Sequence, residues 1–199
     1  MEIKPTNPQD DLNQVRRQMI EDAIRNIIIA VGDDPDREGL KDTPKRVAKM
    51  YLNELTIGIG ADLTQELTTV FAEENHRELV IVKDIDFFSL CEHHLVTYFG
   101  KVHIGYIPNG TVVGISKLAR LVERAARTFS IQERLGTQIA DTIVESLDPL
   151  GVIVVIEAQH MCMMSRGIKK PGSTTVTSSI RGIFKTNDAA RAEFMNLIK

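Results

Sequence analysis

Both cysteines of the chain lie close to histidines. Cys91 begins the segment Cys91-Glu92-His93-His94, and Cys162 lies two residues after His160. Thiolate sulfur and imidazole nitrogen are ligands that zinc prefers, and a site with three protein ligands keeps a fourth coordination position for water. We therefore predict a zinc site with an open position, formed by Cys91, His94 and Cys162.

The spacing of these residues sets what the fold has to supply. Cys91 and His94 are three positions apart, so a tight turn can direct both side chains at one ion, whereas a distant segment must fold back to bring in Cys162. A Cys-x-x-His pair alone is a weak signal. The alternative interpretation is two buried free thiols and a histidine of the hydrophobic core.

The segment that contains Cys162 is basic. No carboxylate occurs from Ala158 to Asn187, and the cations there are Arg166, Lys169, Lys170, Arg181 and Lys185. A metal site within this segment would lie in positive potential, which favours an anionic small substrate. Taken in isolation, a solvated basic face explains the segment equally well.

Composition and charge exclude several classes of protein. The chain has 199 residues, 43% of them hydrophobic, which is enough for a core, and its net charge of −3 argues against wholesale nucleic-acid binding. No apolar run is long enough to cross a bilayer, and the first residues lack the hydrophobic part of a secretory signal. Two cysteines give no disulfide framework, so we expect a reducing compartment, the cytoplasm.

Hydrophobic periodicity predicts two helices at the start of the chain. An amphipathic helix is expected over 12–31, with an apolar stripe formed by Leu12, Val15, Met19, Ala23, Ile27 and Val31. Thr43-Pro44 is typical of an N-cap followed by proline in the first turn, which predicts a second helix that ends before Gly58. The polar residues before Asp11 are expected to form a loose arm.

The rest of the chain mixes strands and helices. β-Branched and aromatic residues predict strands over 79–82, 99–107, 111–115, 151–158 and 174–184. Ser116 is expected to cap one helix, Ser130 and Glu133 to form a capping box that begins another, and residues 188–198 to form the last. This order predicts one α+β domain with an N-terminal helical extension, and strands that these helices cannot cover predict self-association.

Six spaced motifs together resemble the GTP cyclohydrolase I family from about Ile20 to the end of the chain. They are Thr43-Pro44-Lys45-Arg46, Cys91-Glu92-His93-His94, Gly105-Tyr106-Ile107-Pro108, Ser116-Lys117-Leu118-x-Arg120, Gln132-Glu133-Arg134-Leu135 and His160-x-Cys162-x-x-x-Arg166-Gly167. Six motifs in order are far more specific than any one of them, and no motif position departs from the family pattern.

The resemblance implies the tunnelling fold, in which helices pack on an antiparallel sheet. It also implies pentamers whose sheets close into a barrel, two pentamers in a decamer, and active sites between subunits. The implied division is a helical extension over 1–75 and a catalytic domain over 76–199. The implied reaction opens the imidazole ring of GTP, releases formate and closes a new ring to give 7,8-dihydroneopterin triphosphate, the first step of folate or tetrahydropterin synthesis.

His93 and His160 are the predicted acid/base groups, because histidine exchanges protons near physiological pH. Zinc lowers the pKa of a bound water toward neutrality, which makes hydroxide available to attack purine C8. Gln132 is expected to position the base or a water. The alternative for His93 is an imidazole that faces away from the ion, because consecutive residues of an extended segment point to opposite sides.

The remaining predicted site residues bind substrate. Glu133 can accept hydrogen bonds from guanine N1–H and the exocyclic amine, a pair that adenine lacks, although a capping box would also explain it. Lys117, Arg120 and Arg166 match family positions that contact the triphosphate, with Arg46 as a weaker candidate and Ser116 as a hydroxyl donor to ribose or phosphate. A cap at Ser116 would be compatible with that role, because helix N-termini attract phosphate.

Two other functions are open from the sequence. One is a related tunnelling-fold enzyme that acts on a pterin or a purine-derived substrate. The other is a catalytically silent, zinc-stabilised oligomer that binds nucleotide, in which Cys91 and Cys162 serve folding alone. Iron or cobalt could also occupy the ligands predicted for zinc.

Overall fold

The computed structural model describes residues 8–199 and comprises two compact units, of which the first ends at Ile57 and the second is Gly58–Lys199. The first unit is helical, with α1 (Pro8–Ala30), α2 (Thr43–Met50) and the π-helix η1 (Tyr51–Leu55). Both predicted helices are confirmed. The predicted arm was too long, because residues 8–10 are already helical, and residues 1–7 lie outside the described residues. The boundary predicted after residue 75 stays a prediction.

The apolar stripe predicted along the first helix is exposed. Val15, Met19 and Ile27 have 55%, 66% and 57% of their surface accessible, whereas the neighbouring Ile28 is buried. A run of exposed apolar side chains along one helix is typical of a surface that association covers. Within residues 8–199, no helix combines the length and the apolar character that a membrane span requires.

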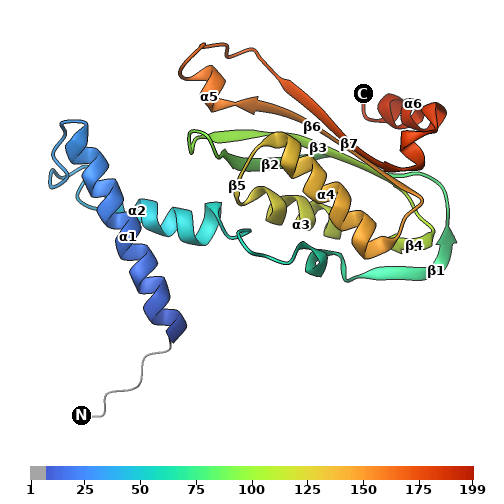
Figure 1. Ribbon diagram of the computed structural model, residues 1–199, viewed down its shortest axis with the longest axis horizontal. Helices are drawn as coiled ribbons and strands as arrows, with labels where there is room; N and C mark the ends of the chain where they lie inside the picture. Colours follow the sequence, from blue (N-terminus) through green and yellow to red (C-terminus); the bar gives the residue numbers. More distant parts are fainter. Residues whose placement is uncertain (1–7) are drawn as a thin grey trace. The chain divides into compact units, whose positions relative to one another are not determined.

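The second unit is built on a five-stranded sheet in the order β5-β2-β3-β6-β7 (Figure 1). These strands are β2 (Val80–Cys91), β3 (Thr97–Ile107), β5 (Phe129–Ser130), β6 (Gly151–His160) and β7 (Thr175–Gly182). Neighbouring strands are antiparallel except for β5, which joins β2 in parallel. A separate two-stranded sheet pairs β1 (Val70–His76) with β4 (Gly110–Val113), and the 3-10 helix η2 (Leu63–Leu67) precedes β1.

Both faces of the central strands are covered. Helices α3 (Ile115–Ala126) and α4 (Gln132–Leu147) pack on one face, where Leu121, Ile139 and Ile143 are fully buried with Val154 of β6. The 3-10 helix η3 (Ile183–Lys185) and α6 (Asp188–Leu197) cover part of the other face through Phe184 and Phe194. This arrangement explains why β6 is apolar at consecutive positions, since its side chains enter a core on both sides.

The structure corrects three strand predictions. Strand β2 runs from Val80 to Cys91, far beyond the predicted 79–82, because a bulge between Val82 and Ile85 interrupts the alternation of apolar side chains. Strand β1 was not predicted. The strand predicted over 111–115 is β4, which spans only Gly110–Val113 and pairs with β1.

None of the three predicted N-caps is an N-cap in the structure. Asp42 is the N-cap of α2, which makes Thr43 the first residue of that helix. Gly114 is the N-cap of α3, which makes Ser116 its second residue. Ser130 belongs to β5, where pairing with Cys91 holds it in the sheet, so Ile131 becomes the N-cap of α4 with no side-chain cap. Glu133 therefore has no capping role. Asp148, which adopts the left-handed conformation at φ 43°, ends α4 before Pro149.

Candidate metal centre

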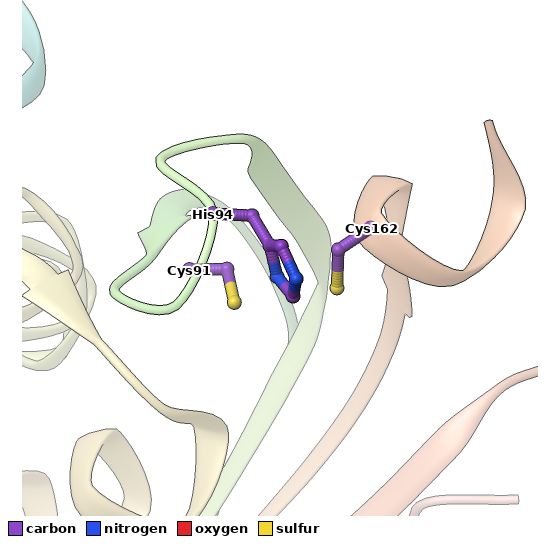
Figure 2. Close-up of side chains that lie close together, drawn as sticks. All are labelled: Cys91, His94 and Cys162. Atoms are coloured by element: carbon purple, nitrogen blue, oxygen red, sulfur yellow. The ribbon is translucent and has the colours of Figure 1, made fainter. Parts of the chain in front are cut away.

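The three predicted ligands converge. Sγ of Cys91, an imidazole nitrogen of His94 and Sγ of Cys162 all lie within 4.8 Å of one another. Figure 2 shows both sulfur atoms and the His94 ring turned toward a common point. Cys91 ends β2, His94 lies in the turn after it, and Cys162 lies on the short helix α5 (Met161–Met164).

The turn between β2 and β3 holds the first two ligands. Its backbone closes through hydrogen bonds from Cys91 N–H to the Val96 carbonyl, at 2.9 Å, and from Leu95 N–H to the Cys91 carbonyl, at 2.8 Å. Leu95 adopts the left-handed conformation at φ 55°, which is strained for a leucine. Such strain is common at functional sites, where the surrounding structure enforces it. Here it lets the chain return toward Cys91 within four residues.

Strand pairing brings in the third ligand. Tyr98, at the start of β3, lies opposite His160, the last residue of β6. Helix α5 follows directly, so Cys162 is placed beside the turn that carries Cys91. The distant segment therefore folds back as the sequence required.

The donor set suits a divalent cation. Cys91 is buried, Cys162 is half-buried, and both are free thiols. Burial raises the pKa of the Cys162 thiol, and the adjacent Cys91 raises it further, because two thiolates repel each other. A bound cation removes this penalty. Within residues 8–199 the cluster offers two sulfurs and one imidazole, the ligand number of catalytic zinc sites.

A cavity of about 220 Å³ joins the metal ligands to the predicted catalytic residues. His93, Gln132, Glu133 and His160 line it together with Cys91 and Cys162. Nδ1 of His93 lies 3.9 Å from the Cys91 sulfur, so His93 faces the cluster and not away from it. A larger cavity, of about 550 Å³ beside Phe88 and Phe99, contains none of these residues.

Gln132 and Tyr98 hold His160 in place. Nε2 of His160 lies 2.9 Å from Oε1 of Gln132, and the imidazole stacks on the Tyr98 ring with centroids 4.8 Å apart. Burial lowers the pKa of His160, and the nearby Glu133 opposes this effect. The imidazole is therefore biased toward its neutral form. Sequence reasoning missed Tyr98, because its contact with His160 arises from strand register alone.

An ion pair ties the ligand turn to helix α4. Arg134 donates hydrogen bonds to both carboxylate oxygens of Glu92, and this contact holds the pKa of the Glu92 carboxyl below its usual range. Glu92 lies between the ligands of the turn, and Arg134 follows Glu133 in the chain. Both residues stand in motifs quoted above, but no local signal indicated that they pair.

The predicted triphosphate ligands are not all in one place. Arg166 is at the cluster, with Nη1 3.0 Å from Nε2 of His94. Arg46 lies on α2 in the first unit, 3.7 Å from Asp42. The remaining three lie on the first turns of α3, namely Ser116, Lys117 and Arg120.

Helix α3 begins at the end of the sheet opposite the cluster. Val113, just before the helix, donates its N–H to the Tyr106 hydroxyl at 3.2 Å, whereas β5, just after the helix, pairs with Cys91. Tyr106 is eight residues along β3 from Tyr98, or roughly 26 Å at the usual rise per residue. Within one chain, Ser116 therefore does not reach the metal cluster.

Comparison with known proteins gives one consistent family. The family model described as GTP cyclohydrolase I matches residues 20–199. The protein named GTP cyclohydrolase 1 of Halalkalibacterium halodurans is 56% identical over 189 residues, which is 94% of this chain and 100% of that protein. The protein of the same name from Dehalococcoides mccartyi is 59% identical over 184 residues, 92% of this chain and 96% of that protein.

Replacing Cys162 tests the metal centre. We expect Cys162→Ala to bind far less metal than the unchanged protein, because one of the three candidate ligands is removed. Elemental analysis after gel filtration measures the metal content. Met163→Ala, a change at the neighbouring cavity residue, serves as the control and should keep it. Full metal retention by Cys162→Ala would contradict the assignment.

Proposed function

The chain belongs to the GTP cyclohydrolase I family, and on this premise we propose that it converts GTP and water to 7,8-dihydroneopterin triphosphate and formate. The observation that carries the proposal is the convergence of Cys91, His94 and Cys162 beside a cavity lined by histidines and Glu133. The product would enter folate or tetrahydropterin synthesis. Two reduced thiols at the centre favour the cytoplasm as the compartment.

Zinc is the proposed ion. Two sulfurs and one imidazole suit zinc better than magnesium or calcium, which prefer oxygen ligands. Bound there, zinc would supply Lewis acidity that lowers the pKa of a water ligand toward neutrality. The elemental analysis above also distinguishes zinc from iron and cobalt.

His93 and His160 are the proposed acid/base groups. His93 lies against the Cys91 sulfur, so it is close to where the attacking water must bind. Burial lowers the pKa of His160, which favours the neutral imidazole that can accept a proton before it donates one. Together they would move protons to N7 and to the ribose ring oxygen as the imidazole ring of guanine opens.

Glu133 is the proposed guanine-recognition residue. It is exposed, lines the cavity and makes no capping hydrogen bond at the start of α4. Its carboxylate can accept both N1–H and the exocyclic amine. Arg166 is proposed to bind the triphosphate from the same side, and Arg46 stays a weaker candidate for that role.

The proposed active enzyme is an oligomer, a decamer of two pentamers. Ser116 and Lys117 lie at the opposite end of the sheet from the cluster, so a neighbouring subunit would have to supply them, together with Arg120 midway along the same helix. The cavity of about 220 Å³ also falls below the roughly 300 Å³ at which small-molecule sites begin. The exposed stripe on α1 gives a further surface for association.

Incubation of the zinc-loaded protein with GTP tests the reaction. We expect formate and, after oxidation, the fluorescence of a neopterin product. Nucleotide binding without formate would favour the silent zinc-stabilised oligomer, and turnover of a pterin instead of GTP would favour a related tunnelling-fold enzyme. ATP serves as the control substrate.

Glu133→Gln tests guanine recognition. We expect kcat/KM for GTP to fall roughly 100-fold or more, because the amide of glutamine directs a donor at a guanine donor and leaves one guanine N–H unpaired in the bound complex. Preference for GTP over inosine triphosphate, which lacks the amine, should shrink as well. Glu145→Gln, an exposed change on the same helix, should alter neither quantity. An unchanged preference would remove Glu133 from the role.

Complementation tests the shared site. Cys162→Ala lacks a metal ligand and Lys117→Ala lacks a phosphate ligand, so each should be nearly inactive alone. Mixed after reversible dissociation, they should recover about a quarter of wild-type activity, since random pairing of subunits makes about a quarter of shared sites intact. A mixture of Cys162→Ala with Cys91→Ala is the control. No recovery in the first mixture would indicate that each chain forms its own site.

A further inference from the structure

The side-chain amide of Gln132 has only one possible orientation. Its nitrogen, Nε2, lies 2.9 Å from the Ile156 carbonyl oxygen and 3.0 Å from the Thr175 carbonyl oxygen, with the Thr177 hydroxyl at 3.1 Å. Carbonyl oxygens can only accept hydrogen bonds, so the amide group that faces them must be the donor NH₂. The amide oxygen, Oε1, is therefore the atom that faces His160.

This orientation determines where His160 carries its proton. Oε1 of Gln132 has no hydrogen and lies 2.9 Å from Nε2 of His160, so the ring nitrogen must donate. We infer that Gln132 is a positioning residue that fixes the neutral His160 ring as the Nε2–H tautomer and leaves Nδ1 to exchange protons with the substrate. This inference rests on the proposed function, in which His160 is an acid/base group.

The ring is held on its face as well as at its edge. Tyr98, which is fully buried, stacks on the imidazole with an interplanar angle of 2°. Turning the ring over would remove Nε2 from Oε1 and leave the buried Gln132 oxygen unpaired, which is costly. Among residues 8–199 no hydrogen bond occupies Nδ1 of His160. Stack and hydrogen bond together leave that nitrogen as the reactive one.

Gln132 itself is 1% exposed. Its nitrogen binds β6 and β7, and its oxygen binds His160, so its effect on the reaction passes through the imidazole. A purely structural glutamine would tie α4 to the sheet in the same way. A structural role needs only the amide donors, whereas the positioning role also needs the Oε1 acceptor that faces His160.

Two substitutions separate the acceptor from the donors. Gln132→Met and Gln132→Glu both lose the amide donors to Ile156 and Thr175, but the carboxylate keeps an acceptor for His160. Solid-state ¹⁵N NMR of histidine-labelled, zinc-loaded protein reports which ring nitrogen is protonated, and the His160 signals are those that disappear in His160→Asn. We expect Nε2 to be protonated in the wild type and in Gln132→Glu, and mixed tautomers in Gln132→Met.

Kinetics give the second readout. Gln132→Met should lower kcat for GTP roughly 10- to 100-fold with KM within about twofold, and Gln132→Glu should recover most of the loss. An equal loss of kcat in both variants would overturn the inference. So would a wild-type His160 that is protonated at Nδ1 and unprotonated at Nε2. If the wild type released no formate, the proposed function would fail, yet the spectra would still decide the tautomer.

Discussion

The antiparallel register between β3 and β6 is the constraint on which the metal cluster depends. It sets Tyr98 opposite His160, so that the end of β6 lies beside the turn that leads into β3. A slip of one residue would turn every side chain of β6 to the other face and move Cys162 away. Gly100 helps to fix the register, because a Cβ there would lie 1.9 Å from the Glu157 carbonyl oxygen. Its neighbours in β3, Phe99 and Lys101, both carry a Cβ and so could not occupy this position.

The same register links chemistry to recognition. Helix α4 begins beside the cluster, since β5 just before it pairs with Cys91. Its first residues are Gln132, bonded to the strands and to His160, and Glu133, which lines the cavity. The pair between Glu92 and Arg134 then joins the ligand turn to this helix. The candidate metal ligands, the proposed proton-transfer groups and the proposed guanine acceptor are thus joined by direct contacts, which is what precise positioning of a substrate requires.

One chain carries these parts at one end of its sheet and the proposed phosphate-binding residues at the start of α3, Ser116 and Lys117, at the other. A helix that leads from one end of a sheet to the other cannot present its first turn and its last turn to the same ligand. Two copies can, if they associate so that opposite ends meet. The phosphate roles proposed for these residues come from the family resemblance, and with those roles the fold requires a site shared between subunits. The family match over residues 20–199 agrees with the motifs that first indicated the family.

Sequence alone indicated the cluster of Cys91, His94 and Cys162, the α+β class and most helices. Those features depend on residue chemistry and on periodicity, which are local. It failed at β1, at the length of β2 and at the three N-caps. A bulge interrupts β2, and pairing with Cys91 holds Ser130 in a strand, so in both places tertiary structure outweighs local preference. Tertiary structure alone decided the stack of Tyr98 on His160, the pair of Glu92 with Arg134 and the separation of Ser116 from the cluster. Each of these depends on which strands meet and in what register, and no short stretch of sequence encodes that.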